Sequence, residues 1–196
     1  PLVAGPDREV DHGQRVVLAV RQQRLAGHVA DEDRAAVLLR RNLGDAWGLR
    51  QLYLKNDAVC HPTWSFKDRV VSVAVSKARE LGLDTVACAS TGNLANSVAA
   101  HAAEAGLPAF VFIPVGLEAG KVLGTLVYGA VVFVVEGTYD DVNRLCSELA
   151  DRHPISLVNS VNQFRLEGQK TASFEIVEAL GEDRPLDALC IPVGNA

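Results

Sequence analysis

From residue 50 onward, short apolar runs alternate with stretches of helical periodicity, and this alternation constrains the fold more than any other feature of the chain. We expect strands at residues 51–54, 85–89, 109–113, 131–135, 155–158 and 188–191. Between them we expect helices at residues 66–81, 93–105, 119–128, 139–151 and 165–180. Such alternation is typical of βαβ units, so the expected fold class is α/β, a parallel sheet with helices on both faces.

The N-terminal region does not follow this alternation and contains no motif. Residues 16–25 and 31–41 are each compatible with a helix. One hypothesis is that residues 6–40 are an insertion or a garbled reading frame, whose deletion would leave solubility and cofactor affinity intact. We therefore treat residues 1–43 as an atypical N-terminal segment of unknown role, separate from residues 44–196.

Composition excludes several classes of protein. Hydrophobic residues make up 48% of the 196 residues, which is enough to bury a core. The net charge of −5 argues against binding to nucleic acid or to an anionic membrane surface. The longest apolar run is much shorter than a membrane-spanning helix, and no signal peptide is visible. The four cysteines form no Cys-x-x-Cys pair, so we expect buried free thiols, no metal site and a cytoplasmic location.

Lys67 lies at the expected start of a helix, within the sequence Pro-Thr-Trp-Ser-Phe-Lys-Asp-Arg at residues 62–69. The start of a helix disfavours a positive charge. We therefore expect the helix field and the neighbouring Arg69 to lower the pKa of the Lys67 amine. An amine of lowered pKa suits Schiff-base chemistry. The alternative is an ordinary exposed lysine.

Three further loops follow expected strands, and ligands of parallel α/β sheets bind beyond the carboxyl ends of strands. Residues 90–93, Ser-Thr-Gly-Asn, can bind an anion through backbone N–H groups, although the same residue types serve as ordinary helix caps. In the polar loop 159–165, Arg165 can contact a phosphate, or the loop is solvated with a capping asparagine. In the loop 192–196, Gly194 lets backbone amides approach an anion, or forms a plain turn.

Together, these loops and their order resemble the β-family of pyridoxal-phosphate enzymes, which share fold type II. Within it, residues 65–69, 87–93 and 165–171 look like the threonine synthase family. The resemblance covers residues 44–196. It implies a cofactor, pyridoxal 5'-phosphate, and a small amino-acid phosphate as substrate. The implied reaction converts O-phospho-L-homoserine and water to L-threonine and phosphate, by γ-elimination and β-addition of water.

The resemblance also implies roles for individual residues. Lys67 would hold the cofactor covalently and act as the catalytic base, and Asn93 would contact the cofactor ring. The substrate carboxylate would be bound by Ser90, Thr91 and Gly92. The substrate phosphate would be bound by Asn159, Ser160 and Arg165. The cradle for the cofactor phosphate would begin with Gly194, Asn195 and Ala196.

The sequence departs from the family pattern at two positions near these loops. Trp64 stands where glycine is usual, and it is tolerated if the backbone there does not require a positive φ, although its bulk would crowd the rim of the cofactor site. Leu94 stands where many members have a threonine within reach of the substrate phosphate.

Several alternatives remain open. Another fold type II enzyme, such as threonine dehydratase, cysteine synthase or cysteate synthase, would share most of these residues. Because the chain ends inside the expected cradle, we expect residues 44–196 to be the N-terminal part of a catalytic domain, truncated at its C-terminus. A non-catalytic fragment, or a ligand-binding module without chemistry, would then fit as well. Homodimers are common among such folds, which makes a homodimer a candidate assembly.

Overall fold

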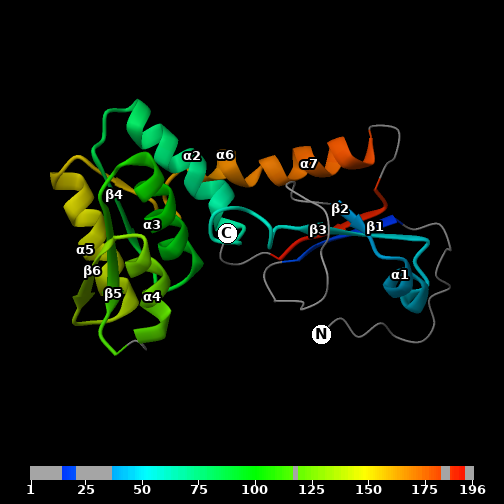
Figure 1. The fold of residues 1–196 in the computed structure, drawn as a ribbon, viewed down its shortest axis with the longest axis horizontal. Coiled ribbons are helices and arrows are strands. Elements are labelled where there is room, and N and C mark those ends of the chain that lie inside the picture. The colour runs from blue at the N-terminus through cyan, green and yellow to red at the C-terminus, as the bar shows by residue number, and fades with distance from the viewer. Residues whose placement is uncertain (1–14, 21–36, 117–118, 182–185, 193–196) are drawn as a thin grey trace. The chain divides into compact units, whose positions relative to one another are not determined.

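A computed structural model of the chain describes residues 15–20, 37–116, 119–181 and 186–192 (Figure 1). The chain divides into two compact units. Unit 1 comprises residues 1–57 and 174–196, and unit 2 comprises residues 58–173. No helix within the described residues is long and apolar enough to cross a membrane.

Unit 2 contains a four-stranded parallel sheet with the strand order β6-β5-β4-β7. Its strands are β4 (Thr85–Ala89), β5 (Ala109–Pro114), β6 (Val131–Val135) and β7 (Ile155–Leu157). Its helices are α2 (Lys67–Glu80), α3 (Asn93–Ala105), α4 (Ala119–Val127), α5 (Tyr139–Arg152) and α6 (Phe164–Gln169). The predicted parallel α/β sheet is therefore confirmed.

Helices cover both faces of this sheet, as predicted. Successive side chains of a strand point to opposite faces. In β4, Val86 and Cys88 belong to a core cluster with residues of α2 and α3. Ala87 and Ala89 belong to a second cluster with residues of α5. Strand β4 is thus buried between two helical layers.

The expected helix at residues 165–180 is instead two helices, α6 and α7 (Thr171–Leu180), which are separated at Lys170. Two side-chain hydroxyls accompany the break. Thr171 Oγ1 donates to the carbonyl of Gly168 at 2.7 Å, and Ser173 Oγ donates to that of Lys170 at 2.6 Å. Hydroxyls that bond to helix carbonyls compete with the backbone ladder, which explains the interruption.

Unit 1 contains a second four-stranded sheet, with the order β2-β3-β1-β8. Its strands are β1 (Arg15–Val20), β2 (Val37–Leu39), β3 (Gln51–Asn56) and β8 (Ala188–Cys190), and its helix α1 spans Arg41–Trp47. Strand β1 pairs in parallel with both β3 and β8, whereas β2 is antiparallel to β3. The α7 helix continues from unit 2 into this unit.

The helices considered for residues 16–25 and 31–41 are wrong at residues 16–20 and 37–39, which belong to strands. Arg41, at the end of the second range, is the first residue of α1. The run from Val16 to Val20 has three β-branched residues among five and finds parallel partners on both sides, which favours a strand. Because β1 lies between β3 and β8, deletion of residues 6–40 would remove the strand that joins them. This pairing argues against the hypothesis that the deletion is harmless.

A buried lysine links β3 to α7 inside unit 1. Lys55 is 1% exposed. Its Nζ lies 2.9 Å from Asp57 Oδ1 and 2.8 Å from Glu175 Oε2. A buried charge is costly unless it is paired. The carboxylates of Asp57 and Glu175, which lie far apart in the sequence, compensate the buried positive charge of Lys55.

The cysteines only partly match the expectation of buried thiols. Cys88 and Cys146 are buried, and burial raises the pKa of the Cys146 thiol to about 12. Cys60 is half-buried and Cys190 is exposed. All four cysteines, which lie within the described residues, are thiols outside any disulfide.

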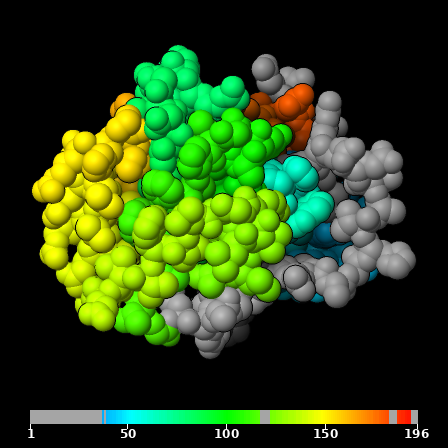
Figure 2. All heavy atoms as spheres, turned by 60° about the vertical axis from the view of Figure 1, so that its left-hand side comes forward, coloured from blue at the N-terminus to red at the C-terminus, as the bar shows by residue number. Residues whose placement is uncertain are grey.

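Helix α4 lies on the surface of unit 2, where Figure 2 shows it in yellow-green. Its outer side exposes Leu123, Leu126 and Val127. Its inner side contacts α3 through Thr125, whose hydroxyl donates to Asn96 Oδ1 at 2.8 Å. This bond holds α4 against the first turns of α3.

Candidate active site

Lys67 is the first residue of α2, as expected. The residue is half-buried. Its backbone N–H donates to Ser65 Oγ at 3.1 Å, and its Nζ lies 6.0 Å from the centre of the Phe66 ring. The preceding loop, residues 62–66, therefore ends in a backbone turn that presents the lysine at the start of the helix.

Asp68 ties the Lys67 loop to helix α3. Its buried carboxylate accepts hydrogen bonds from the backbone N–H groups of Thr63 and Ser65, at 3.0 and 3.2 Å. It also accepts from the hydroxyls of Thr63 and Ser97, both at 2.7 Å. His101 Nε2 lies 3.5 Å from Asp68 Oδ1, close enough for an ion pair when the imidazole is protonated. One carboxylate thus fixes both the loop and the neighbouring helix.

Asp68 belongs to the motif at residues 62–69, but the sequence pattern indicates no role for it, and none of the predicted motifs includes Ser97 or His101. A signal for the last two was available. Asn93, Ser97 and His101 recur every fourth residue in a helix otherwise rich in alanine. Residues four apart share a helix face, so this spacing indicates one polar stripe, which faces the Lys67 loop at Ser97 and His101.

Trp64 has a φ of 57°, in the left-handed region. The backbone therefore does adopt a positive φ at residue 64, where glycine is usual in the family that the sequence resembles. A tryptophan would be tolerated there only if a positive φ were not required. A bulky residue in this conformation is strained. The indole is 59% exposed and meets the His61 ring edge-on, with 6.3 Å between ring centres.

This strain predicts an unusual order of stability at residue 64. Alanine is normally better tolerated than glycine by roughly 0.5–1 kcal/mol in regular structure. At a positive φ the preference reverses, so we expect Trp64→Gly to be more stable than Trp64→Ala by about 1 kcal/mol. Both variants lose the indole, so their difference isolates the backbone. Urea unfolding measures it, and a more stable alanine variant would contradict the left-handed conformation.

The Ser-Thr-Gly-Asn loop connects β4 to α3, as predicted. Ser90 N–H donates to Phe112 O at 3.3 Å, and Gly92 N–H lies 3.4 Å from Ser90 Oγ. No described side chain caps α3, whose N-cap residue is Gly92. The alternative of an ordinary side-chain cap therefore fails. The first backbone N–H groups of a helix have no intrahelical acceptor, so this helix start suits an anion.

The loop after β7 contains Asn159 and Ser160. Because β7 and β4 are parallel, this loop lies at the same end of the sheet as the loop at residues 90–93. Asn159 is buried, and its side chain bonds to the backbone of Ala89, the last residue of β4. Ser160 is exposed. Asn162 Oδ1 accepts from the N–H of Phe164, the first residue of α6, at 3.0 Å, but the N-cap residue of that helix is Gln163 and it forms no side-chain cap. Asn159 joins the loops at residues 90–93 and 159–165.

Arg165 is a buried cation in the second residue of α6. It is 3% exposed, and its Nε has no hydrogen-bond partner within the described residues. Burial lowers the pKa of the guanidinium, while the neighbouring Cys88 and Tyr139 raise it. An arginine does not deprotonate in proteins, so this side chain is a buried positive charge with a donor to spare. Such a group favours a negatively charged ligand.

The expected phosphate cradle at Gly194, Asn195 and Ala196 lies outside the described residues. The other candidates fall into two groups in unit 2. Asp68 joins the Lys67 loop to α3, and Asn159 joins the Ser90 loop to the segment that leads to Arg165.

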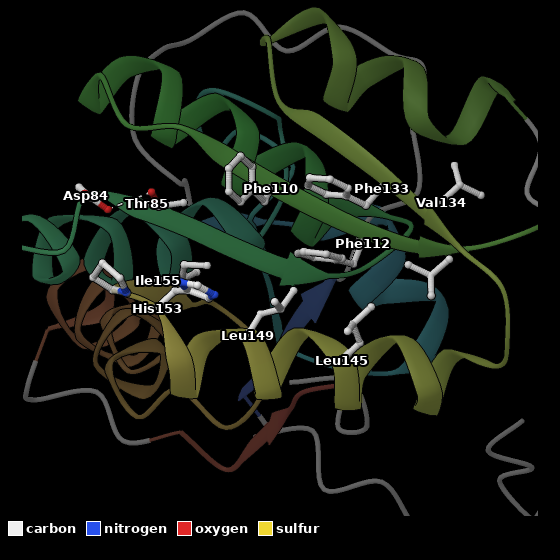
Figure 3. Close-up of a pocket in the computed structure, with 12 residues that line it drawn as sticks. Asp84, Thr85, Phe110, Phe112, Phe133, Val134, Leu145, Leu149, His153 and Ile155 are labelled. Atoms are coloured by element: carbon white, nitrogen blue, oxygen red, sulfur yellow. Dashed lines mark hydrogen bonds between the residues drawn. The ribbon is translucent and has the colours of Figure 1, made fainter.

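A separate apolar groove of about 610 Å³ opens on the α5 side of the sheet, and Figure 3 shows its lining. Phe112 and Phe133 stack there with 4.9 Å between ring centres, and Phe110 meets Phe133 edge-on. Leu145 and Leu149 of α5 form part of the opposite wall. None of the predicted site residues lines this groove, which is therefore distinct from the candidate active site.

Comparison with known proteins identifies the family. A family model described as "Pyridoxal-phosphate dependent enzyme" matches residues 30–196. The chain belongs to this family. Pyridoxal phosphate is accordingly its cofactor, as the sequence motifs implied.

Named relatives include several threonine synthases. The protein from Synechocystis sp. is 52% identical over 147 residues, which cover 74% of this chain and 38% of that protein. The protein from Halalkalibacterium halodurans is 46% identical over 156 residues, covering 79% and 43% respectively. The chain thus spans about two fifths of the length of these relatives.

Solved structures confirm the fold type II architecture. Apo diaminopropionate ammonia lyase from Escherichia coli has a TM-score of 0.66 at 22% identity, covering 78% of this chain and 48% of that one. The processed form of threonine deaminase isoform 2 from Solanum lycopersicum has a TM-score of 0.66 at 23% identity, covering 74% and 40%.

The described residues fit the cofactor of this family. A lysine stands at the start of a helix, where its amine can hold an aldehyde. The next helix along the chain begins without a side-chain cap within the described part of the structure, at Gly92 and Asn93. Both features are compatible with a cofactor that carries an aldehyde and a phosphate.

Proposed function

We propose that this chain is part of a threonine synthase, which converts O-phospho-L-homoserine and water to L-threonine and phosphate. Phosphate leaves from Cγ, and water adds at Cβ, so one water enters for each phosphate released. The proposal is supported by identities of 46–52% to threonine synthases. It is also supported by the chemistry of the site.

The buried guanidinium of Arg165 is the observation that carries the substrate assignment. O-phospho-L-homoserine has two anionic ends, a carboxylate and a phosphate. The uncapped start of α3 suits the first, and Arg165, with an unbonded Nε, suits the second. A substrate without a phosphate would leave this buried charge uncompensated, which is costly.

Each residue then has a task in the reaction. Lys67 takes the proton from Cα and then from Cβ. Bound pyridoxal phosphate supplies the electron sink that makes these protons acidic. Ser90, Thr91 and Gly92 hold the substrate carboxylate, while Ser160 and Arg165 orient the leaving phosphate. These contacts fix the substrate relative to the base, which is the main contribution of the protein.

Leu94 does not argue against this assignment. Its side chain is half-buried and packs against the core cluster formed by α2, α3 and the sheet. The hydrophobic side chain therefore has a structural contact of its own. Phosphate binding in our proposal depends on Ser160 and Arg165 instead.

Lys67→Ala is expected to abolish covalent capture of the cofactor. When the wild-type chain is incubated with pyridoxal phosphate and reduced with borohydride, the peptide that contains Lys67 should gain the mass of the reduced cofactor. The alanine variant should show no such peptide. Lys77→Ala serves as the control, because this half-buried lysine of the same helix pairs with Glu80, and the variant should label like wild type. Equal labelling of the Lys67 variant would contradict the assignment.

The substrate is tested by product analysis. The purified protein should release phosphate and threonine in equal amounts from O-phospho-L-homoserine. Arg165→Met should raise KM for this substrate at least tenfold, while the exposed Arg144→Met should not. Release of 2-oxobutanoate from threonine, without phosphate release from the phosphorylated substrate, would instead identify a dehydratase.

A further inference from the structure

Asn159 extends the β4 ladder with a side chain in place of a strand. Pairing of β4 with β7 ends at Ala87 and Leu157, after which Val158 N–H donates to Ala87 O. One step further along β4, Ala89 N–H donates to Asn159 Oδ1 at 2.9 Å, and Asn159 Nδ2 donates to Ala89 O at 3.1 Å. A carboxamide has the same donor and acceptor as a peptide group. Asn159 therefore satisfies both backbone groups of Ala89.

Helix α5 completes this arrangement with two side chains from its first turns. Tyr139 Oη donates to Ala89 O at 2.9 Å. Asn143 Oδ1 accepts the second bond from Asn159 Nδ2, at 3.1 Å. Tyr139 and Asn143 are four residues apart and so share a helix face. With these bonds, the Asn159 carbonyl and both of its amide hydrogens have partners inside the protein.

The residue held in this way is the one from which the Ser-Thr-Gly-Asn loop departs. Ala89 is the last residue of β4, and Ser90 is the first residue of the loop. An anion-binding loop works best when its donors are held near their final positions before the ligand arrives. Three side chains that fix the preceding backbone would provide such preorganisation.

We propose that Tyr139, Asn143 and Asn159 form an Ala89 clamp, a set of positioning residues for the loop at residues 90–93. The proposal rests on the proposed function only in that this loop binds the substrate carboxylate. It assigns Asn159 a different role from the one the family resemblance implied. Asn159 acts through Ala89, and the direct phosphate contacts fall to Ser160 and Arg165.

Two variants test the clamp. Tyr139→Phe removes one hydroxyl, and Asn159→Asp keeps the shape of the side chain but removes both Nδ2 donors. Tyr128→Phe, an exposed tyrosine just after α4, is the control. Amide hydrogen exchange, resolved by peptide, should accelerate at least fivefold at residues 88–93 in both test variants. Residues 109–113 of β5 and the control variant should keep wild-type rates.

Two outcomes would overturn the clamp. One is wild-type exchange at residues 88–93 in both test variants. The other is an equal acceleration throughout unit 2, which would indicate general destabilisation. Substrate kinetics supply the second readout. With O-phospho-L-homoserine, Tyr139→Phe should raise KM several-fold and change kcat less than twofold, although this residue has no assigned contact with substrate. An effect of Asn159→Asp on KM without any effect of Tyr139→Phe would favour direct phosphate binding and contradict the clamp.

The exchange experiment separates this inference from the proposed function. Local acceleration of exchange depends on the hydrogen bonds to Ala89 and not on any ligand. If exchange accelerates locally while no threonine is formed by the wild type, the clamp stands and the assigned reaction fails.

Discussion

Replacing Gly168 with alanine is expected to lower the free energy of unfolding by about 3 kcal/mol or more. A Cβ at this position would lie 2.7 Å from Val70 Cα and 2.8 Å from Arg69 C, and closer still to Arg69 O. These are backbone atoms of α2, so they cannot rotate away. Helices α2 and α6 would have to separate at the first turn of α2, next to Lys67.

The sign of this effect distinguishes packing from helix propensity. Within a helix, alanine is normally favoured over glycine by about 1 kcal/mol. Gly168→Ala would therefore be stabilising if α6 did not approach α2 closely. Chemical unfolding followed by circular dichroism measures the change. Leu166→Ala, an exposed residue of the same helix, is the control and should change stability little. A stabilised Gly168→Ala protein would show that the two backbones do not touch.

Asp68→Asn is expected to cost about 3 kcal/mol of stability and to loosen the Lys67 loop. The carboxylate accepts four hydrogen bonds, two on each oxygen. In asparagine an NH₂ group replaces one of these oxygens, so a donor would face the two donors that the oxygen had accepted from. A buried donor left without an acceptor costs roughly 1–3 kcal/mol, and more when a charge is involved. Asp151→Asn, an exposed residue in the last turn of α5, should be nearly neutral.

The same carboxylate predicts a pH dependence of stability. Burial raises the pKa of Asp68, but the neighbouring His101 side chain and hydrogen bonds from Ser97, Thr63 and Ser65 together hold it below its ordinary value. A folded-state pKa below the unfolded one, about 3.9, stabilises the protein above that pH. The contribution is lost as pH falls from about 4 through the folded pKa. The free energy of unfolding of the wild type should therefore approach that of Asp68→Asn under acid conditions. A difference between the two that stays constant down to pH 2 would contradict a contribution from the Asp68 charge.

Local sequence signals were sufficient to predict much of the secondary structure of unit 2. The predicted limits of β4, α3 and β6 agree with the structure at both ends. Helix α3 ends at Ala105 and is followed by Gly106, whose φ of 68° is left-handed. Glycine after an apolar periodic segment is a known stop signal. Such signals act within a few residues of the place they mark, so a single sequence contains them.

Non-local pairing explains what sequence reasoning missed in unit 1. The apolar run at residues 16–20 is too short for periodicity to separate a buried strand from a helix. Its partners, β3 and β8, lie more than 30 residues away in the sequence, and β8 lies near the opposite end of the chain. No local pattern reports that contact.

In the candidate site, too, local features could be predicted from the sequence and non-local contacts could not. Motifs located the loops that carry Lys67, Ser90 and Arg165. They did not predict the polar contacts that hold these loops, such as those from Asp68 to Ser97 or from Asn159 to Ala89. The first pair is 29 residues apart and the second is 70, so both depend on tertiary neighbours.

The buried pairing of Lys55 with Glu175 has a consequence for how the chain matures on the ribosome. Unit 2 is one continuous stretch, whereas unit 1 joins residues that precede it to residues that follow it. During synthesis β3 emerges long before α7 supplies the second carboxylate for its lysine. We therefore expect the parallel sheet of unit 2 to fold first. Residues 1–57 of unit 1 can complete their fold only after residues 174–196 have been synthesised.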